Sequence, residues 1–125
     1  FLEAARKGNQ IKVFNFGKQL RDFTFVADIV DGVYNTILSY EIFNSAEILN
    51  IGNGSPIQLM DFILTIEKIT DTELKKHFVE AQPGDVDATY ACIDKIYNKL
   101  QFRPRHTLQS GLEKFVKWYD AYFDE

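Results

Sequence analysis

Short apolar runs alternate with segments of helical periodicity along the whole chain, and this alternation is the feature that most constrains the fold. The short runs are rich in β-branched and aromatic residues, which favours strands. Between them, hydrophobic residues recur every three or four positions, which favours helices. The predicted strands are residues 11–16, 21–26, 47–51 and 76–80. The predicted helices are residues 1–7, 27–40, 55–70 and 94–100 and a last helix from about residue 107.

Two helix boundaries have clear chemical signals. Gly8 follows the first helix and is typical of a C-terminal cap. Ser55 and Pro56 are a good N-cap and first-position pair for the helix that runs to about residue 70. The apolar stripe of the helix over 27–40 is expected to face the core. The chain therefore predicts an α/β fold, and residues 1–125 have the length of one mixed domain.

Composition excludes several classes of partner. The net charge of −4 and the pI near 5.2 argue against a protein that coats nucleic-acid phosphates with a basic face. A single cysteine, Cys92, excludes an internal disulfide and a Cys-rich metal site, and neither histidine has a ligand partner at metal-binding spacing. No apolar run has membrane length. We expect no nucleic-acid, membrane or metal partner and a cytoplasmic location.

Two side chains are suited to binding a nucleotide. Arg21 stands at the entrance of a predicted strand, and its guanidinium can hold two phosphate oxygens at once. Asp85 follows a Pro-Gly pair, so its carboxylate can point outward from a turn toward two vicinal hydroxyls. Spacing leaves other roles open: Arg21 could pair with Asp22 or Asp28, and Asp85 could make an Asx-type bond within its own turn.

Four segments follow one another along the chain: Arg-Asp-Phe-Thr-Phe-Val from Arg21, Asn-Ile-Gly-Asn-Gly-Ser-Pro from Asn50, Gln-Pro-Gly-Asp-Val from Gln82, and the helical run from Gly111 to Tyr119. In this order they resemble the extended short-chain dehydrogenase/reductase family of NAD-dependent nucleotide-sugar epimerases and dehydratases. From residue 11 to residue 123 the chain is similar to the C-terminal part of these enzymes, and most of all to UDP-glucuronate 4-epimerases. The resemblance implies a small mixed α/β substrate-binding lobe whose Rossmann half is missing.

The resemblance also implies roles for three residues. Arg21 would contact the diphosphate of a UDP-sugar, Asp85 its ribose, and Gln82 would lie in the same site. Many related enzymes carry a second arginine at the position of Gln82, and the neutral amide here favours the glucuronate-type group. The alternatives are a UDP-hexose 4-epimerase lobe, a nucleotide-sugar dehydratase lobe, or a stand-alone α/β binding module without catalysis.

The residues that carry the family's chemistry are not found in this sequence. NAD binding needs a Gly-rich turn at a helix N-terminus, and the run from Gly52 to Gly54 has Ile57 at the third glycine position, so we interpret it as a plain turn. No tyrosine is followed four residues later by lysine. We therefore predict no catalytic, cofactor-binding or metal-binding residue in the chain, which alone would be inactive. The resemblance implies that NAD binds to the missing N-terminal Rossmann domain of a homodimeric full-length enzyme.

Overall fold

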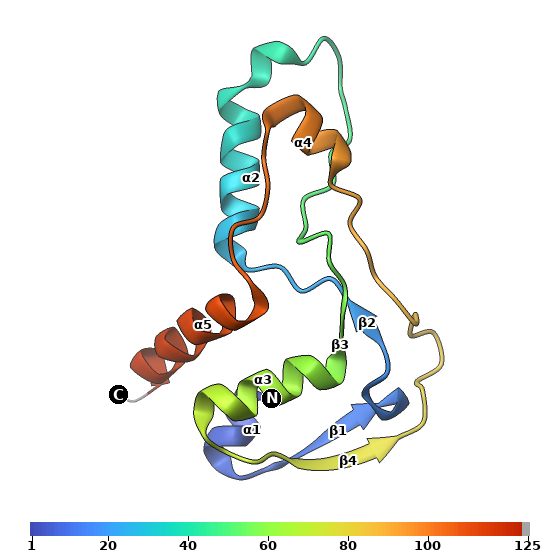
Figure 1. Cartoon of the computed structure of the whole chain (residues 1–125), viewed down its shortest axis with the longest axis vertical. Helices are drawn as coiled ribbons and strands as arrows, with labels where there is room; N and C mark the ends of the chain where they lie inside the picture. Colours follow the sequence, from blue (N-terminus) through green and yellow to red (C-terminus); the bar gives the residue numbers. More distant parts are fainter. Residues whose placement is uncertain (124–125) are drawn as a thin grey trace.

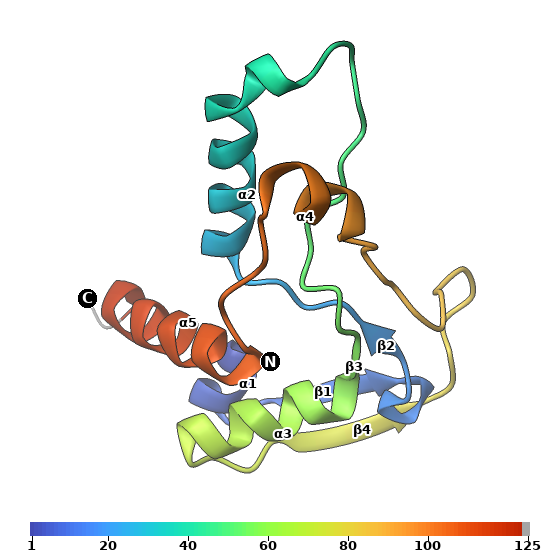
Figure 2. The same cartoon turned by 45° about the horizontal axis from the view of Figure 1, so that its top comes forward.

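The structure, a computed structural model, describes residues 1–123, so the last two residues of the predicted 1–125 domain lie outside the described residues. The elements form two parts, which Figures 1 and 2 show from two directions. The base contains α1, β1, β2, β3, α3, β4 and α5, and the arm contains α2, residues 43–52 and α4. No helix within residues 1–123 is long and apolar enough to cross a lipid bilayer. In chain order the elements are α1 (Leu2–Lys7), β1 (Gln10–Phe14), η1 (Asn15–Gly17), β2 (Leu20–Arg21), α2 (Val26–Leu38), η2 (Tyr40–Ile42), β3 (Ile57–Gln58), α3 (Leu59–Thr70), β4 (Lys75–Val79), α4 (Asp94–Leu100) and α5 (Leu108–Phe123).

The base is organised around the parallel pair of β1 and β4, in which Val13 lies opposite Phe78. Parallel strands need a crossover connection, and α3 lies within the chain that joins them. Val13, Ile63 and Ile66 are almost completely buried, so α3 covers this pair with its apolar face. Leu112 of α5 joins the same cluster, and α5 packs against α3.

Several predicted boundaries move because the backbone turns earlier than the apolar pattern suggests. β1 ends at Phe14, two residues before the expected end, since Asn15, Phe16 and Gly17 all have positive φ and form η1. Of the strand predicted over 21–26, only Arg21 lies in a strand, because the N–H of Asp22 donates to Thr89 Oγ1 instead of to a neighbouring strand.

The predicted start of α3 is also wrong. Ser55 and Pro56 precede β3, which pairs antiparallel with β2 through Ile57 opposite Arg21. The helix begins at Leu59, whose N–H donates to the carbonyl of Gln19 at 2.9 Å. The pairing with β2 therefore keeps residues 57 and 58 extended and delays the helix by about one turn.

The strand predicted over residues 47–51 does not form within the described chain. The segment is extended but no described strand pairs with it, and Ile48 is 84% exposed. Side chains hold it instead: Lys95 Nζ donates to the Ile48 carbonyl at 2.9 Å and Asn50 Nδ2 to the Cys92 carbonyl at 3.4 Å. The strand-forming pattern is present, and what it lacks is a neighbouring strand.

The apolar stripe of α2 faces solvent, contrary to the prediction that it would face the core. The buried face carries Asp28 and Gly32, and a Cβ at Gly32 would lie 2.9 Å from Ile51 Cγ2. The helix therefore packs on its own chain with its small and polar side. Six large apolar side chains of α2 are between 46% and 66% exposed: Val26, Val30, Val33, Tyr34, Ile37 and Leu38.

Asp28 attaches α2 to the segment that enters α5. Its carboxylate is 1% exposed and accepts the backbone N–H groups of Arg105 at 3.0 Å and His106 at 3.1 Å, while His106 Nδ1 lies 2.9 Å away. Burial alone raises the pKa of Asp28, but these hydrogen bonds outweigh it and hold the pKa below its usual value of 3.8. The ionised carboxylate therefore stabilises the junction between arm and base.

Replacing Asp28 by Asn should lower the free energy of unfolding by about 3 kcal/mol, because a buried, multiply bonded charge is lost. The folded-state pKa is the lower one, so this contribution is complete above pH 3.8 and decreases as the pH falls further. Urea unfolding at neutral pH and at about pH 3 should therefore show the difference between wild type and variant shrinking in acid.

Asp31→Asn is the matched control, since Asp31 forms a more exposed ion pair with Arg105. It should cost less than about 1 kcal/mol. Equal effects of the two substitutions would contradict the role given to Asp28.

Candidate functional site

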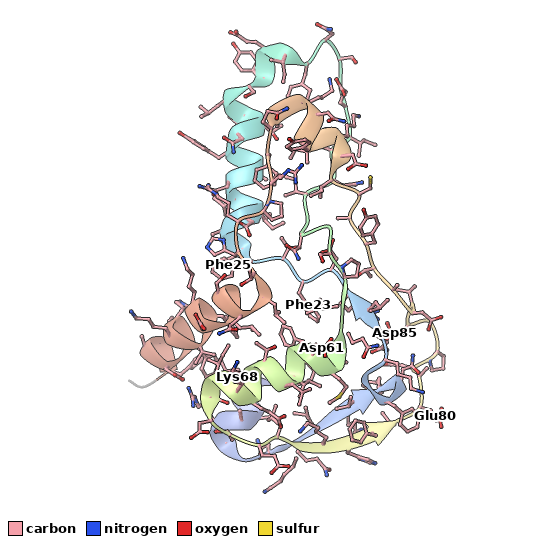
Figure 3. The ribbon with its side chains drawn as sticks, viewed as in Figure 1. Phe23, Phe25, Asp61, Lys68, Glu80 and Asp85 are labelled. Carbon is pink, nitrogen blue, oxygen red and sulfur yellow. The ribbon has the colours of Figure 1, made fainter. Side chains whose placement is uncertain are left out.

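The structure brings Arg21 and Asp85 together at the end of β2. Arg21 Nη2 lies 2.5 Å from Asp85 Oδ1, and Arg21 Nη1 donates to the Leu20 carbonyl at 2.9 Å. Figure 3 shows Asp85 beside β2, on the long connection that follows β4. Both side chains are partly exposed, so the pair is accessible to a ligand. Of the partners considered from sequence, Asp22 and Asp28 bind other groups, and Arg21 pairs with the second candidate residue instead.

The second oxygen of Asp85 has a different donor. Gln19, which is 4% exposed, donates from Nε2 to Asp85 Oδ2. Sequence patterns gave no signal for this residue, because an isolated glutamine before a short strand is ordinary. The Asp85 carboxylate thus accepts hydrogen bonds from one charged and one neutral donor, which lie in and directly before β2.

Gln82 lies on the same turn as Asp85. Its carbonyl accepts the backbone N–H of Asp85 at 3.0 Å, and Gly84 between them has a φ of 86°. The left-handed conformation is one that glycine adopts without strain. The three residues predicted from sequence therefore lie on two adjacent segments, with the Gln82 residue exposed.

Backbone pairing fixes these segments to each other. The N–H of Leu20 donates to the carbonyl of Asp87 at 2.8 Å, and the N–H of Thr89 donates to the carbonyl of Leu20 at 3.1 Å. Leu20 and Ala88 form a parallel bridge on one side of β2, and β3 pairs on the other. β2 is short, but both of its edges form backbone pairs with other segments, so the backbone at Arg21 is held in place.

The carboxylate of Asp22 organises the turn between Gly52 and Gly54. Oδ2 accepts the N–H groups of Gly54 and Ala91, each at 3.0 Å, and Oδ1 accepts the N–H of Ser55 at 3.4 Å. A Cβ at Gly52 would lie 2.4 Å from the Cβ of Ala91. The Asp22 carboxylate therefore already accepts the backbone N–H groups that an anionic ligand at this turn would need.

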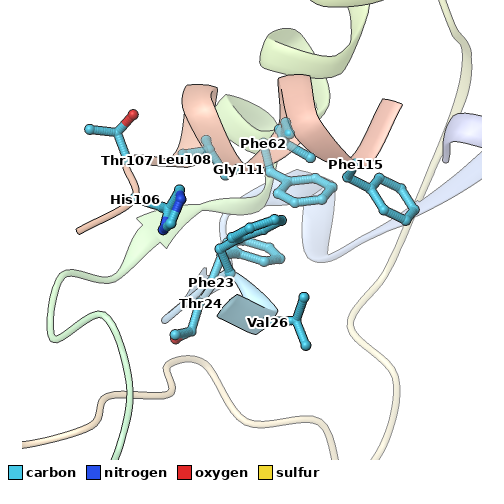
Figure 4. A pocket seen from close by; sticks show the side chains of 11 residues that line it. Phe23, Thr24, Val26, Phe62, His106, Thr107, Leu108, Gly111 and Phe115 are labelled. Carbon is cyan, nitrogen blue, oxygen red and sulfur yellow. The ribbon is translucent and has the colours of Figure 1, made fainter. Parts of the chain in front are cut away.

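An apolar pocket lies where the base meets the arm, next to this turn. Its volume is about 200 Å³, and Figure 4 shows the aromatic rings that line it. Phe23 and Phe62 stack with ring centroids 4.2 Å apart, and the rings of Phe25 and His106 lie 4.7 Å apart. No group of three or more His, Cys, Asp and Glu side chains that could hold a metal ion occurs within residues 1–123.

Comparison with known proteins shows which family of enzymes the chain resembles. The profile of the NAD dependent epimerase/dehydratase family matches residues 1–52. Protein CapI of Staphylococcus aureus is 35% identical over 98% of the chain, and UDP-glucuronate 4-epimerase 3 of Arabidopsis thaliana is 30% identical over 94% of it. The chain is therefore similar, over nearly its whole length, to members of the NAD-dependent epimerase/dehydratase family.

A solved structure agrees with this assignment. UDP-glucuronic acid 4-epimerase from Bacillus cereus, in complex with UDP-glucuronic acid and NAD, superposes with a TM-score of 0.85 at 27% identity over 98% of the chain. The chain spans only 38% of that protein, 41% of CapI and 31% of the plant enzyme. The predicted family and fold class are therefore confirmed for a segment much shorter than its relatives.

Gly52→Ala should destabilise the protein by about 1 to 3 kcal/mol, the usual cost of an added methyl group in a filled space. The double variant Gly52→Ala with Ala91→Gly should recover part of this loss, because it removes the atom that the new Cβ would meet. Thermal unfolding of the two single variants and the double variant measures the coupling. Strictly additive losses would show that the contact between residues 52 and 91 does not limit this position.

Proposed function

We propose that the chain is the C-terminal nucleotide-sugar-binding domain of an NAD-dependent epimerase that interconverts UDP-glucuronate and UDP-galacturonate at C4. The observation that carries the proposal is the pairing of Arg21 with Asp85 on braced, partly exposed segments. A guanidinium can bind the phosphate oxygens of a nucleoside diphosphate in a bidentate way, and a turn carboxylate can accept hydrogen bonds from its ribose hydroxyls. The similarity to UDP-glucuronate 4-epimerases supports the choice of sugar.

In this proposal the free protein keeps its two ligand groups neutralised by each other. An arriving diphosphate offers the guanidinium several oxygens and more charge than one carboxylate does, so it can displace Asp85 from Arg21. The released oxygen of Asp85 then accepts a ribose hydroxyl. Gln82, exposed on the same turn, offers hydrogen bonds without adding charge.

The remaining functions belong, in this proposal, to parts of the protein outside the chain. The backbone N–H groups of the turn after Gly52 already bind Asp22, so we assign no described residue to NAD and none to the chemical step. The chain alone should therefore bind a UDP-sugar without converting it. NAD would be held by an N-terminal Rossmann domain, and the complete enzyme would be a cytoplasmic homodimer.

The arm is where we expect that domain to dock. The stripe on α2 exposes six large apolar side chains on one helix face, which is unusual for a surface that stays in water. Residues 47–51 lie extended and unpaired within the described chain, and Gly32 and Lys95 attach them to α2 and to the first turn of α4. Such a segment can add to a sheet edge. Relatives two to three times as long contain enough additional chain to supply that sheet.

Arg21→Lys should weaken binding of UDP-glucuronate to the chain by about 5- to 150-fold, which corresponds to about 1 to 3 kcal/mol. Lysine keeps the charge but loses the two-pronged geometry that fits a diphosphate. Calorimetric titration measures the dissociation constant, and a second titration with uridine, which has no phosphate, should show no effect of the substitution.

Arg103→Lys is the matched control, because Arg103 stacks on the Tyr97 ring at 4.0 Å, on α4 rather than at β2. An unchanged affinity of the Arg21→Lys variant for UDP-glucuronate would contradict the proposal that Arg21 binds the diphosphate. Conversion of the sugar by the purified wild-type chain would overturn the assignment of chemistry to another domain.

The isolated chain should self-associate at high concentration and bind a hydrophobic dye, because the stripe on α2 is exposed. Ile37→Glu should reduce both, whereas Leu64→Glu on α3 makes the same change at another exposed position and should have little effect. Sedimentation velocity and dye fluorescence report the two properties. A wild-type chain that stays monomeric without binding dye would contradict the proposed docking surface.

A further inference from the structure

Gln19 is a buried polar side chain to which the proposed function has not yet given a role. It is 4% exposed and lies two residues before Arg21. Its carbonyl accepts the N–H of Leu59 at 2.9 Å, so the start of α3 fixes its backbone. Burying an amide is unfavourable unless its hydrogen bonds are made, and the bond from Nε2 to Asp85 Oδ2 makes one of them.

The two donors to Asp85 differ in what a diphosphate would do to them. Arg21 is charged and binds Asp85 Oδ1, so phosphate oxygens compete for it. Gln19 is neutral and buried, so an anionic ligand has little reason to attract it and little access to it. A diphosphate can therefore take Arg21 away from Asp85, whereas the hydrogen bond from Gln19 to Asp85 remains.

We propose that Gln19 is a positioning residue of the UDP-sugar site, which keeps the Asp85 carboxylate in place when the diphosphate takes Arg21. This inference rests on the proposed function. Asp85 needs such support because every residue from 80 to 90 is exposed, and none of them belongs to the core cluster. With Oδ2 held by Gln19, Oδ1 is released toward the ribose without loss of the carboxylate's orientation.

The side chain at this position must be a neutral donor for the mechanism to work. Gln19→Met keeps the length of the side chain but removes the hydrogen bond. Gln19→Glu keeps the shape and places a second carboxylate against Asp85, which would push the first one away. One variant loses a hydrogen bond and the other adds charge repulsion, so they affect folding in different ways. If one of them fails to fold, the other still allows the test.

The experiment is a calorimetric titration of the chain with UDP and with 2′,3′-dideoxyuridine diphosphate, which lacks both ribose hydroxyls. Each Gln19 variant should weaken UDP binding by about tenfold, the range for a hydrogen bond that orients a charged group. Neither should change the affinity for the dideoxy compound, because Asp85 has no hydroxyl to bind there. In an Asp85→Asn background, Gln19→Met should have little further effect.

The possible outcomes separate the inference from the proposal beneath it. Equal weakening of both compounds would show that Gln19 only supports the fold, and no weakening of either would show that Asp85 is positioned without it. Wild-type protein that fails to bind UDP would overturn the proposed function and this inference together. UDP binding that depends on Arg21 but not on Gln19 would overturn the inference alone.

Discussion

The carboxylate of Asp22 is the contact on which the rest of the site depends. It gathers backbone N–H groups from the turn at Gly54 and from Ala91, so three distant stretches of chain meet at one side chain. Its own N–H donates to Thr89 Oγ1 at 3.2 Å, which completes the attachment. Arg21 directly precedes Asp22, and Ala91 lies on the connection that carries Asp85, so this carboxylate attaches the segments of both candidate residues. The hydrogen bonds from backbone N–H groups to this single carboxylate thus connect chain segments that the short strands do not pair.

Asp28 repeats the same device at the entrance to α5, where it accepts the N–H groups of Arg105 and His106. The two aspartates lie six residues apart on either side of the start of α2. Together they attach the beginning of the helix to the turn at residues 52–54 and to the segment before α5. Ionised carboxylates bonded to backbone donors therefore hold arm and base together, in addition to the apolar contacts around the pocket at Phe23.

The sequence predicted the elements whose stabilising partners lie within the chain. The helix at α3 forms because its apolar residues pack with Val13 of β1 in the core cluster, and the strand at β4 forms because it pairs with β1. The segment over 47–51 has the right composition for a strand, but composition cannot supply a neighbour. The stripe on α2 has helical spacing, and spacing alone does not say which side of the helix meets the core. In the candidate site, Arg21 and Asp85 were predicted from side-chain chemistry and from the family resemblance, whereas Gln19 and Asp22 act through contacts that only the folded chain creates.

The chain crosses from base to arm at residue 26 and again before α4, and it returns to the base after residue 52 and before α5. Four covalent connections therefore join the two parts, which makes neither of them a module that can be cut out at a single linker. A rotation of the arm would have to bend all four connections at once, so large hinge motions between the two parts are strongly restrained. Arg21 lies next to one of these crossings, and a ligand that pulls on it acts directly on the start of α2. Only about five residues of backbone thus separate Arg21 from the helix whose apolar face is exposed.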